Sequence, residues 1–260
     1  MTTATWDPGQ YLRYADERGR PFVDLVSRIT TEALAVVDLG CGPGQLTPVL
    51  RQRWPQAHIT GLDSSPEMID RAREQSTDPL TEYAVADAVS WEPEQPLDVL
   101  VSNAMLQWVP GHADLLLPWT EHIAPGGTLA FQVPGNFDAP SHRLLWETAA
   151  RTAYSRFTQD LGPRAAVLDP ADYLALLSRP GWAVDAWETT YLHVLQGEDA
   201  VFEWISGTGA RPVLQALPDD VRADFEADYK RALREAYPRQ DVGTVLPFRR
   251  IFAVAHRTGL

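Results

Sequence analysis

The first half of the chain alternates short apolar runs with stretches whose apolar residues recur at helical spacing. The apolar runs predict strands at residues 35–40, 58–63, 81–87, 97–103 and 128–133. The intervening stretches predict helices at residues 46–54, 66–75 and 113–123, with Ser64 or Ser65 capping the second and Pro-Gly-Gly ending the third. Strands that alternate with helices in this way indicate a parallel sheet with helices on both faces.

The second half of the chain is less regular and mostly helical in pattern. Helical spacing recurs at residues 141–157, 170–178, 198–206 and 218–237, and near the start of the chain at 11–29. Residues 183–195 predict one strand or two joined strands, and residues 248–257 predict a final strand. So much helix before the last strand predicts a lid over the strand ends.

The composition fits a globular α/β protein. The 260 residues are 45% hydrophobic and 22% charged, which supplies a core and excludes a disordered chain. The formal net charge of −13 disfavours nucleic acid and anionic membranes as partners, because like charges repel. An anionic substrate would therefore need a local cluster of basic residues.

Cysteine usage and the first residues favour a cytoplasmic protein. Cys41 is the only cysteine, so we expect no internal disulfide and no cysteine-bound metal. The segment MTTATWDPGQ lacks the basic and apolar regions of a signal peptide, and no apolar run has the length of a membrane span. These patterns leave the oligomeric state open.

The most specific motif is DLGCGPG, between the first predicted strand and the helix after it. Glycines let the backbone turn tightly and approach a ligand, and the following helix N-terminus presents unpaired N–H groups to an anion. The glycines Gly40, Gly42 and Gly44 follow a G-x-G-x-G spacing. A dinucleotide fingerprint would instead need its third glycine at Gln45, so the motif disfavours NAD.

Three acidic residues lie at or just after the first three predicted strands, where ligands of open parallel sheets bind. Asp38 is suited to the amino group of S-adenosylmethionine, which NAD lacks at this position. Asp63 is placed for the two ribose hydroxyls and Asp87 for the adenine amino group. Each acid alone would equally fit a helix cap or a solvated loop, but together with the glycines they predict an S-adenosylmethionine site.

With these motifs, residues 33–135 resemble the class I S-adenosylmethionine-dependent methyltransferase family. The resemblance implies a Rossmann-like α/β fold with a seven-stranded, mostly parallel sheet whose last strand is antiparallel. We expect one domain over 1–260, with a cofactor-binding core at 30–135 and a helical lid with substrate elements in 136–247. S-adenosyl-L-methionine would be the cofactor and S-adenosyl-L-homocysteine its product. The expected cofactor-binding residues are Asp38, Gly40, Cys41, Gly42, Gly44, Asp63, Ser64, Met68, Asp87, Ala88 and Asn103.

The whole chain resembles a narrower family, the bacterial trans-aconitate methyltransferases. The resemblance runs from WDPGQYLRYADERGRP through VDLGCGPGQLT, LRQRWPQAHITGLDSSPEMI and SNAMLQWVPGH to EWISGTGARPVLQ, EAYP and FRRIFAVAHR. It implies that one carboxylate of a small tricarboxylate is converted to a methyl ester without a metal ion. The chain departs from the family pattern at Arg249 and in GTG at 207–209, both outside the cofactor motif.

Such a substrate would need little chemical help and firm binding. A carboxylate has a pKa near about 4 and is ionised at neutral pH, so we expect no general base and no catalytic side chain. Arginine suits the remaining carboxylates, because its planar fork meets a carboxylate at two points. The candidates are Arg211, Arg250, Arg18 and Arg20. Any arginine in so acidic a chain also fits a surface salt bridge.

Four further residues are candidates for the substrate pocket. Gln107 and Trp108 follow the fourth predicted strand, and the Trp108 ring suits a neighbouring sulfonium cation. Tyr191 and His193 alternate along the strand at 183–195 and therefore share one face. Core packing is the alternative interpretation of Trp108, Tyr191 and His193.

Three other functions remain as alternatives. A methyltransferase for a malonyl-carrier protein would use the same chemistry, but its acidic partner calls for a basic docking face, which the charge of −13 disfavours. A sensor that binds S-adenosylmethionine without catalysis would need no second pocket lined by arginine. A dehydrogenase is the weakest alternative, because Gln45 breaks its fingerprint.

Overall fold

The structure, a computed structural model, describes residues 15–163 and 167–259, which form two compact units. The sheet unit comprises the described residues of 15–135, 167–189 and 250–260. The helical unit comprises the described residues of 136–166 and 190–249. Each unit therefore combines separate stretches of the sequence.

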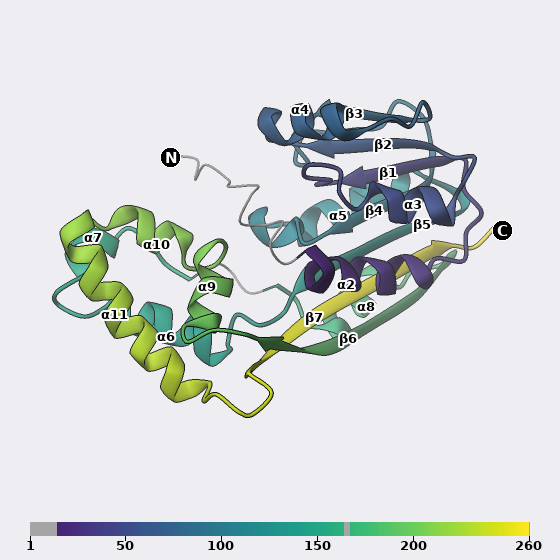
Figure 1. Cartoon of the computed structure of the whole chain (residues 1–260). Coiled ribbons are helices and arrows are strands. Elements are labelled where there is room, and N and C mark those ends of the chain that lie inside the picture. Colours follow the sequence, from purple (N-terminus) through teal and green to yellow (C-terminus); the bar gives the residue numbers. More distant parts are fainter. Residues whose placement is uncertain (1–14, 164–166, 260) are drawn as a thin grey trace. The chain divides into compact units, whose positions relative to one another are not determined.

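Seven strands form one sheet in the order β3-β2-β1-β4-β5-β7-β6 (Figure 1). The strands are β1 Ala35–Leu39, β2 His58–Asp63, β3 Thr81–Val85, β4 Leu97–Asn103, β5 Ile123–Pro134, β6 Trp182–Leu195 and β7 Thr244–Arg257. Strand β1 pairs in parallel with β2 and β4, β2 with β3, and β4 with β5, whereas β7 is antiparallel to β5. The predicted sheet, with its antiparallel last strand, is confirmed.

Helices complete both units. The sheet unit contains α2 Ala15–Ser27, α3 Thr47–Arg53, α4 Pro66–Gln75, the 3-10 turn η1 Leu106–Trp108, α5 Ala113–Glu121 and α8 Pro170–Leu177. The helical unit contains α6 Pro140–Ala149, α7 Ser155–Thr158, α9 Ala200–Ser206, α10 Arg211–Ala216 and α11 Asp219–Ala236. Among the residues described, no helix has both the length and the apolar character to cross a membrane.

The core of the sheet unit follows from the alternation of side chains along each strand. Odd-numbered residues of β5 such as Phe131 pack in one apolar cluster with Tyr173 of α8, and the two rings meet edge to face at 4.9 Å. Thr128 lies on the opposite face, where its hydroxyl hydrogen-bonds with that of Thr31 at 2.7 Å. Gln132, four residues beyond Thr128, therefore lies on this second face as well.

The core of the helical unit is organised around α11. Phe225, Tyr229 and Leu233 recur at four-residue spacing and are all buried, so one stripe of the helix faces the apolar cluster. The Tyr229 hydroxyl donates a hydrogen bond to the carbonyl oxygen of Ser141 in α6 at 2.7 Å. The role of these helices as a lid stays a prediction.

Strand β5 begins earlier than the sequence predicts. Leu97 of β4 pairs with Ile123, but Val99 pairs with Thr128, so the register shifts between the two pairs. The Pro-Gly-Gly segment at 125–127, interpreted as a helix stop, lies inside this irregular part of the strand. The predicted start at residue 128 is therefore wrong, because a bulge accommodates the glycines without ending the pairing.

Two helical predictions are also wrong in detail. The single helix predicted at 141–157 is divided, since α6 ends at Ala149 and α7 begins at Ser155. No helix is predicted between residues 206 and 218, yet Arg211 is the first residue of α10, followed by Pro212 in the first turn. Proline is tolerated there because the first helical N–H groups have no partner within the helix.

Candidate functional site

The turn after β1 carries three glycines in the left-handed region, with φ of +85° at Gly40, +57° at Gly42 and +73° at Gly44. Other residues rarely adopt this conformation. Space is also tight, since a Cβ atom on Gly40 would lie 2.4 Å from the Cβ atom of Met105. The Gly40 N–H donates to the carbonyl oxygen of Leu62 at 2.7 Å, which ties the turn to β2. The turn has the conformation that the glycine spacing predicts.

Asp63, the last residue of β2, connects the glycine turn to α4. Its Oδ2 atom accepts a hydrogen bond from the Gly42 N–H and its Oδ1 atom accepts one from the Ser65 N–H, both at 2.9 Å. A carboxylate has about four lone-pair sites, so further acceptor capacity remains. Asp63 can therefore hold the turn in place and still accept hydrogen bonds from two hydroxyl groups.

Asp38 is a buried carboxylate on β1, with only 3% of its surface exposed. Burial and, to a smaller extent, the charge of Asp63 raise the pKa of Asp38 to about 7. No ion pair or hydrogen bond to this carboxylate occurs within the described ranges of the chain. An adjacent ammonium group would favour the ionised form, so the position suits a cationic ligand.

Asp87 follows β3 and has an exposed side chain, whose Oδ1 atom accepts a hydrogen bond from the Val89 N–H at 2.9 Å. The Ala86 N–H donates to the carbonyl oxygen of Asp63 at 3.0 Å, which brings this loop beside the end of β2. Asp87 therefore lies in a loop beside the end of β2, with its side chain exposed. Three other predicted cofactor residues lie nearby along the chain, the exposed Ser64, the buried Met68 and the half-buried Ala88.

A buried tyrosine that the sequence analysis did not select packs against the glycine turn. The Tyr83 hydroxyl donates to Thr47 Oγ1 at 3.0 Å, and a Cβ atom on Gly44 would lie 2.7 Å from the Tyr83 hydroxyl oxygen. Cys41 lies in the same apolar cluster, and burial raises the pKa of its thiol. Cys41 is therefore a small filler of the turn and not a reactive cysteine.

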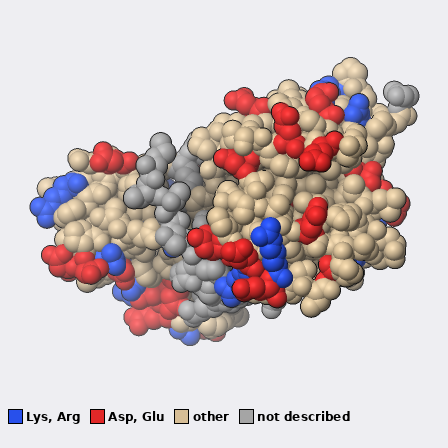
Figure 2. Space-filling model, turned by 90° about the horizontal axis from the view of Figure 1, so that it is seen from above, with Lys and Arg blue, Asp and Glu red and all other residues tan. Residues whose placement is uncertain are grey.

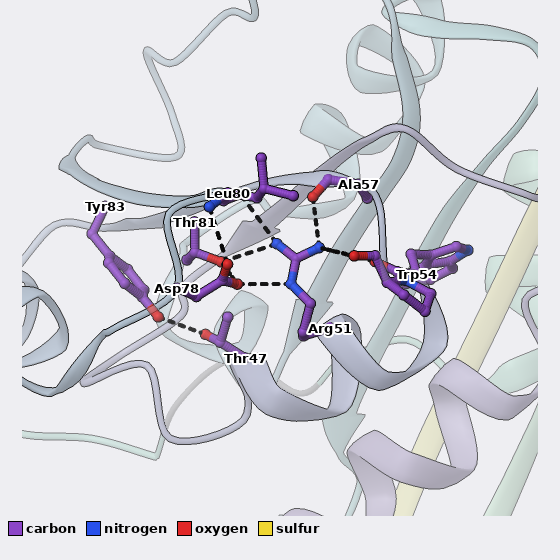
Figure 3. Close-up of polar contacts among 9 residues, drawn as sticks. Thr47, Arg51, Trp54, Ala57, Asp78, Leu80, Thr81 and Tyr83 are labelled. Carbon is purple, nitrogen blue, oxygen red and sulfur yellow. Dashed lines mark hydrogen bonds and ion pairs between the residues drawn. The ribbon is translucent and has the colours of Figure 1, made fainter.

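Arg51 of α3 fixes the loops that lead into β2 and β3 (Figure 3). Its Nη1 atom donates to the carbonyl oxygens of Trp54 at 3.1 Å and Ala57 at 2.8 Å, and its Nη2 atom donates to that of Leu80 at 3.2 Å. Its Nε atom binds the Asp78 carboxylate at 2.7 Å. One guanidinium thus fixes the starts of two strands, β2, which ends at Asp63, and β3, which leads into the loop that carries Asp87.

The chain leaves β4 through a strained turn. Ala104 has φ +54° and is the one non-glycine residue with positive φ in the part of the chain described. Its carbonyl oxygen accepts a hydrogen bond from Gln107 Nε2. Asn103 Oδ1 and Gln107 Oε1 are buried without a hydrogen-bond partner among the described residues. Strain and unsatisfied polar atoms collect at functional sites, so the end of β4 is a candidate for contact with ligand.

Arg250 lies in β7 opposite Pro134 of β5 and is 7% exposed. Its Nη1 atom donates to Gln132 Oε1 at 3.5 Å. The burial of Arg250 contradicts its interpretation as a surface residue. Gln132 is 1% exposed, and the sequence analysis did not select it. The available signal was a single amide within the apolar run TLAFQV.

Two predicted substrate residues belong to the aromatic core of the helical unit. Tyr191 and His193 are buried on one face of β6, with ring centroids 6.4 Å apart. His193 also stacks on Trp204 at 4.6 Å. These contacts favour core packing for both residues. Their role in substrate binding stays a prediction.

The remaining candidates have varied surroundings. Trp108 is 37% exposed, so its interpretation as a core residue is wrong. Arg211 is half-buried at the start of α10, and Arg20 is exposed on α2. Arg18 lies in α2, but its side chain is outside the described residues.

Charge and metal-binding potential limit what the surface can bind. Acidic side chains cover more of the face shown in Figure 2 than basic side chains do, in line with the net charge of −13. Within the described ranges, no group of three or more histidine, cysteine, aspartate or glutamate residues could hold a metal ion.

Known proteins share both the sequence and the fold. The methyltransferase domain family matches residues 36–127. A trans-aconitate 2-methyltransferase of Streptomyces avermitilis is 54% identical, over 97% of this chain and 97% of its own. One of Streptomyces coelicolor is also 54% identical, over 98% of this chain and 88% of its own.

Solved structures extend the likeness to the fold alone. A plantazolicin methyltransferase in complex with SAH has a TM-score of 0.54 and 14% identity, and the match covers 97% of this chain and 91% of that one. At this identity only the fold can be compared. The predicted class I methyltransferase fold is confirmed.

Proposed function

We propose that this chain, which belongs to the family of the trans-aconitate 2-methyltransferases, methylates one carboxylate of trans-aconitate with S-adenosylmethionine as donor. The assignment of trans-aconitate as the substrate rests on the 54% identity, over 97% of the chain, to a relative of that name. The geometry of the sheet unit supports the cofactor. The products are S-adenosylhomocysteine and a monomethyl ester.

The end of β1 and its neighbours fit the proposed cofactor. S-adenosylmethionine, when bound, supplies an electrophilic methyl group on a sulfonium. Asp38 is a buried carboxylate suited to an ammonium group, and Asp63 retains acceptor capacity for two ribose hydroxyls. Asp87, with its exposed carboxylate, is assigned to the adenine amino group. The glycines let backbone approach the ligand closely.

A carboxylate substrate explains why the chain needs no general base. The substrate is ionised at neutral pH, so the protein has to position it and exclude water. We assign the binding of the other two carboxylates to arginines, with Arg250 and Arg211 as first candidates. We further infer a cytoplasmic enzyme for a free small acid, with neither nucleic acid nor membrane as partner, from the charge of −13 and the single cysteine.

A substrate panel tests this function. Purified protein is incubated with labelled S-adenosylmethionine and, separately, trans-aconitate, cis-aconitate, isocitrate and citrate. We expect ester formation to be fastest with trans-aconitate. Binding of S-adenosylhomocysteine without methylation of any acid would indicate a sensor, and methylation of a malonyl-carrier protein alone would indicate the carrier-type enzyme.

The pH profile tests the absence of a base. With both substrates saturating, kcat is expected to stay level from about pH 6.5 to about 8, because the carboxylate has its pKa near about 4. A steep rise with an apparent pKa near 7 would contradict the base-free reaction. His142 and His193 would then be the first residues to replace.

A further inference from the structure

Gln132 is an amide in an otherwise apolar part of the sheet. It is 1% exposed and lies three residues before Gly135, near the carboxyl end of β5. Its partner in register on β4 is Asn103, the last residue of that strand. Partners in register on neighbouring strands share a face of the sheet, so both amides face the same way at the edge where parallel sheets bind ligands.

The oxygen of the Gln132 amide has a hydrogen-bond partner, whereas the nitrogen has none among the described residues. The oxygen Oε1 accepts a hydrogen bond from Arg250 Nη1 at 3.5 Å. The nitrogen Nε2 is buried and has no hydrogen-bond partner among the described residues. Asn103 Oδ1 is likewise without a partner, so the two amides are not bonded to each other. Native proteins rarely leave such groups unsatisfied, because each one destabilises the fold.

The arrangement places two kinds of donor next to each other. Gln132 contributes an N–H2 group, and Arg250, two residues further along the same sheet face, contributes a guanidinium with five N–H groups. The hydrogen bond from Arg250 orients the amide so that its oxygen meets the arginine and its N–H2 group is directed elsewhere. Adjacent N–H donors of this kind match the two oxygens of a carboxylate.

We propose that Gln132 is a substrate-binding residue whose amide N–H2 group, beside the Arg250 guanidinium, holds a carboxylate of the acid that is not methylated. The inference rests on the proposed function, since it names the group that receives a carboxylate of the substrate. A neutral amide contributes a hydrogen bond without adding charge to this buried part of the sheet. The pair therefore selects for the number and position of carboxylates in the acid.

The first test replaces Gln132 by methionine, which has a similar length and no donor. We expect the KM for trans-aconitate to rise about ten- to a hundredfold, as for the loss of a hydrogen bond to a charged group. The dissociation constant of S-adenosylhomocysteine should stay within about twofold. The melting temperature should change little, because removal of the unsatisfied N–H2 group offsets loss of the oxygen that accepts from Arg250. Binding of trans-aconitate to the complex with S-adenosylhomocysteine, measured by calorimetry, should weaken by the same factor as KM rises.

A second variant, Gln132→Glu, tests whether the charge at this position affects substrate binding. A carboxylate at this position pairs with Arg250 and repels the substrate anion, so the KM should rise further than in Gln132→Met. Thr128→Val is the matched control on the same face of the same strand. Thr128 is 1% exposed and its hydroxyl bonds Thr31, so this change should lower the melting temperature and leave the KM unaltered.

The outcomes separate this inference from the proposed function. If wild-type protein methylates trans-aconitate and folded Gln132→Met does so with an unchanged KM, the amide binds a buried water or nothing, and the inference is wrong. If wild-type protein neither methylates nor binds trans-aconitate, the proposed function fails first and the inference falls with it. If Gln132→Met raises the KM but also lowers both the melting temperature and the affinity for S-adenosylhomocysteine, Gln132 is structural and the inference is also wrong.

Discussion

Polar side chains have different surroundings in the sheet unit and in the helical unit. In the helical unit, charged residues meet one another at the surface, as in the ion pairs of Arg151 with Asp228 at 3.0 Å and of Arg234 with Asp199 at 2.5 Å. In the sheet unit, Asp38 is buried without an ion pair among the described residues, and Gln132 lies near the end of β5 with an unsatisfied nitrogen. Buried polar groups without partners reduce stability, so their presence at strand ends indicates selection for binding.

The largest expected effect comes from Asp38→Asn. The folded-state pKa of about 7 lies above the ordinary value of 3.8. The stability that this group contributes is therefore fully present below about pH 4 and is lost as the pH rises through about 7, amounting to up to about 4 kcal/mol. At pH 8 the variant should melt at a higher temperature than wild type, yet bind S-adenosylhomocysteine about a hundredfold more weakly, because it cannot ion-pair with the ammonium group.

The pH dependence of binding sharpens this prediction. Wild-type affinity for S-adenosylhomocysteine should fall as the pH drops below about 7, since Asp38 must release a proton before it binds an ammonium group. Calorimetry in buffers of different ionisation heat should detect that proton, and Asp38→Asn should abolish the signal. Equal proton release in both proteins would contradict the assignment of Asp38.

The arginines allow the two units to be compared directly, because Arg250 belongs to the sheet unit and Arg211 to the helical unit. Arg250→Ala and Arg211→Ala are each expected to raise the KM for trans-aconitate about ten- to a hundredfold, the value of a lost hydrogen bond to a charged group. S-adenosylmethionine affinity should stay nearly constant. Lysine at either position should restore the KM only in part, since an ammonium group lacks the rigid fork of a guanidinium.

Melting temperatures are needed alongside these constants, because Arg250 is buried and its loss can also affect folding. If both variants fold and have the wild-type KM for trans-aconitate, neither arginine binds the substrate. Arg18 and Arg20 would then be the next residues to replace.

A smaller effect is expected for Asp63→Ala. The change removes the ribose contact and leaves the Gly42 and Ser65 N–H groups without their acceptor, so S-adenosylhomocysteine affinity should fall about tenfold. It also removes the charge that contributes to the raised pKa of Asp38, so the pH below which binding weakens should shift downward. Isothermal titrations across pH measure both effects, and unchanged affinity would refute the role of Asp63.

The smallest effect is expected in the helical unit. Arg234→Ala removes an ion pair in which the Arg234 side chain is 45% exposed. Exposed pairs contribute about 0.2–1 kcal/mol, so denaturant unfolding should change by no more than that. The KM values should not change. A large loss of activity would show that surface charge in this unit contributes to catalysis, against the contrast between the units.

Most elements of the sheet unit could be predicted from the sequence, because each strand is short, apolar and bounded by turn residues. DLGCGPG, Asp63 and Asp87 were found for the same reason, since each lies at or just after the end of a recognisable strand. The β5 boundary was wrong because Pro125, Gly126 and Gly127 end most elements, whereas here they form a bulge within the pairing. Local sequence does not show which strand a segment will pair with.

The less visible residues depend on tertiary neighbours. Gln132 looks like one polar position in a strand, and only the register with Arg250 and Asn103 makes it a candidate. Tyr83 matters because of what it packs against, which no local pattern states. In the helical unit, the break between α6 and α7 has no glycine or proline inside it, so helical spacing alone predicted one helix.

The packing of Tyr83 between two glycines has a consequence for how this protein tolerates mutation. A Cβ atom would lie 2.7 Å from the Tyr83 hydroxyl oxygen if added to Gly44, and 2.5 Å from its ring if added to Gly61. In a combinatorial library, alanine at Gly61, which has ordinary strand geometry within β2, should therefore need a smaller residue at position 83 and a small shift of Cys41, whose Sγ atom would lie 3.0 Å from the new Cβ atom. The same exchange should not permit alanine at Gly44, because its φ of +73° disfavours any side chain whatever the space around it.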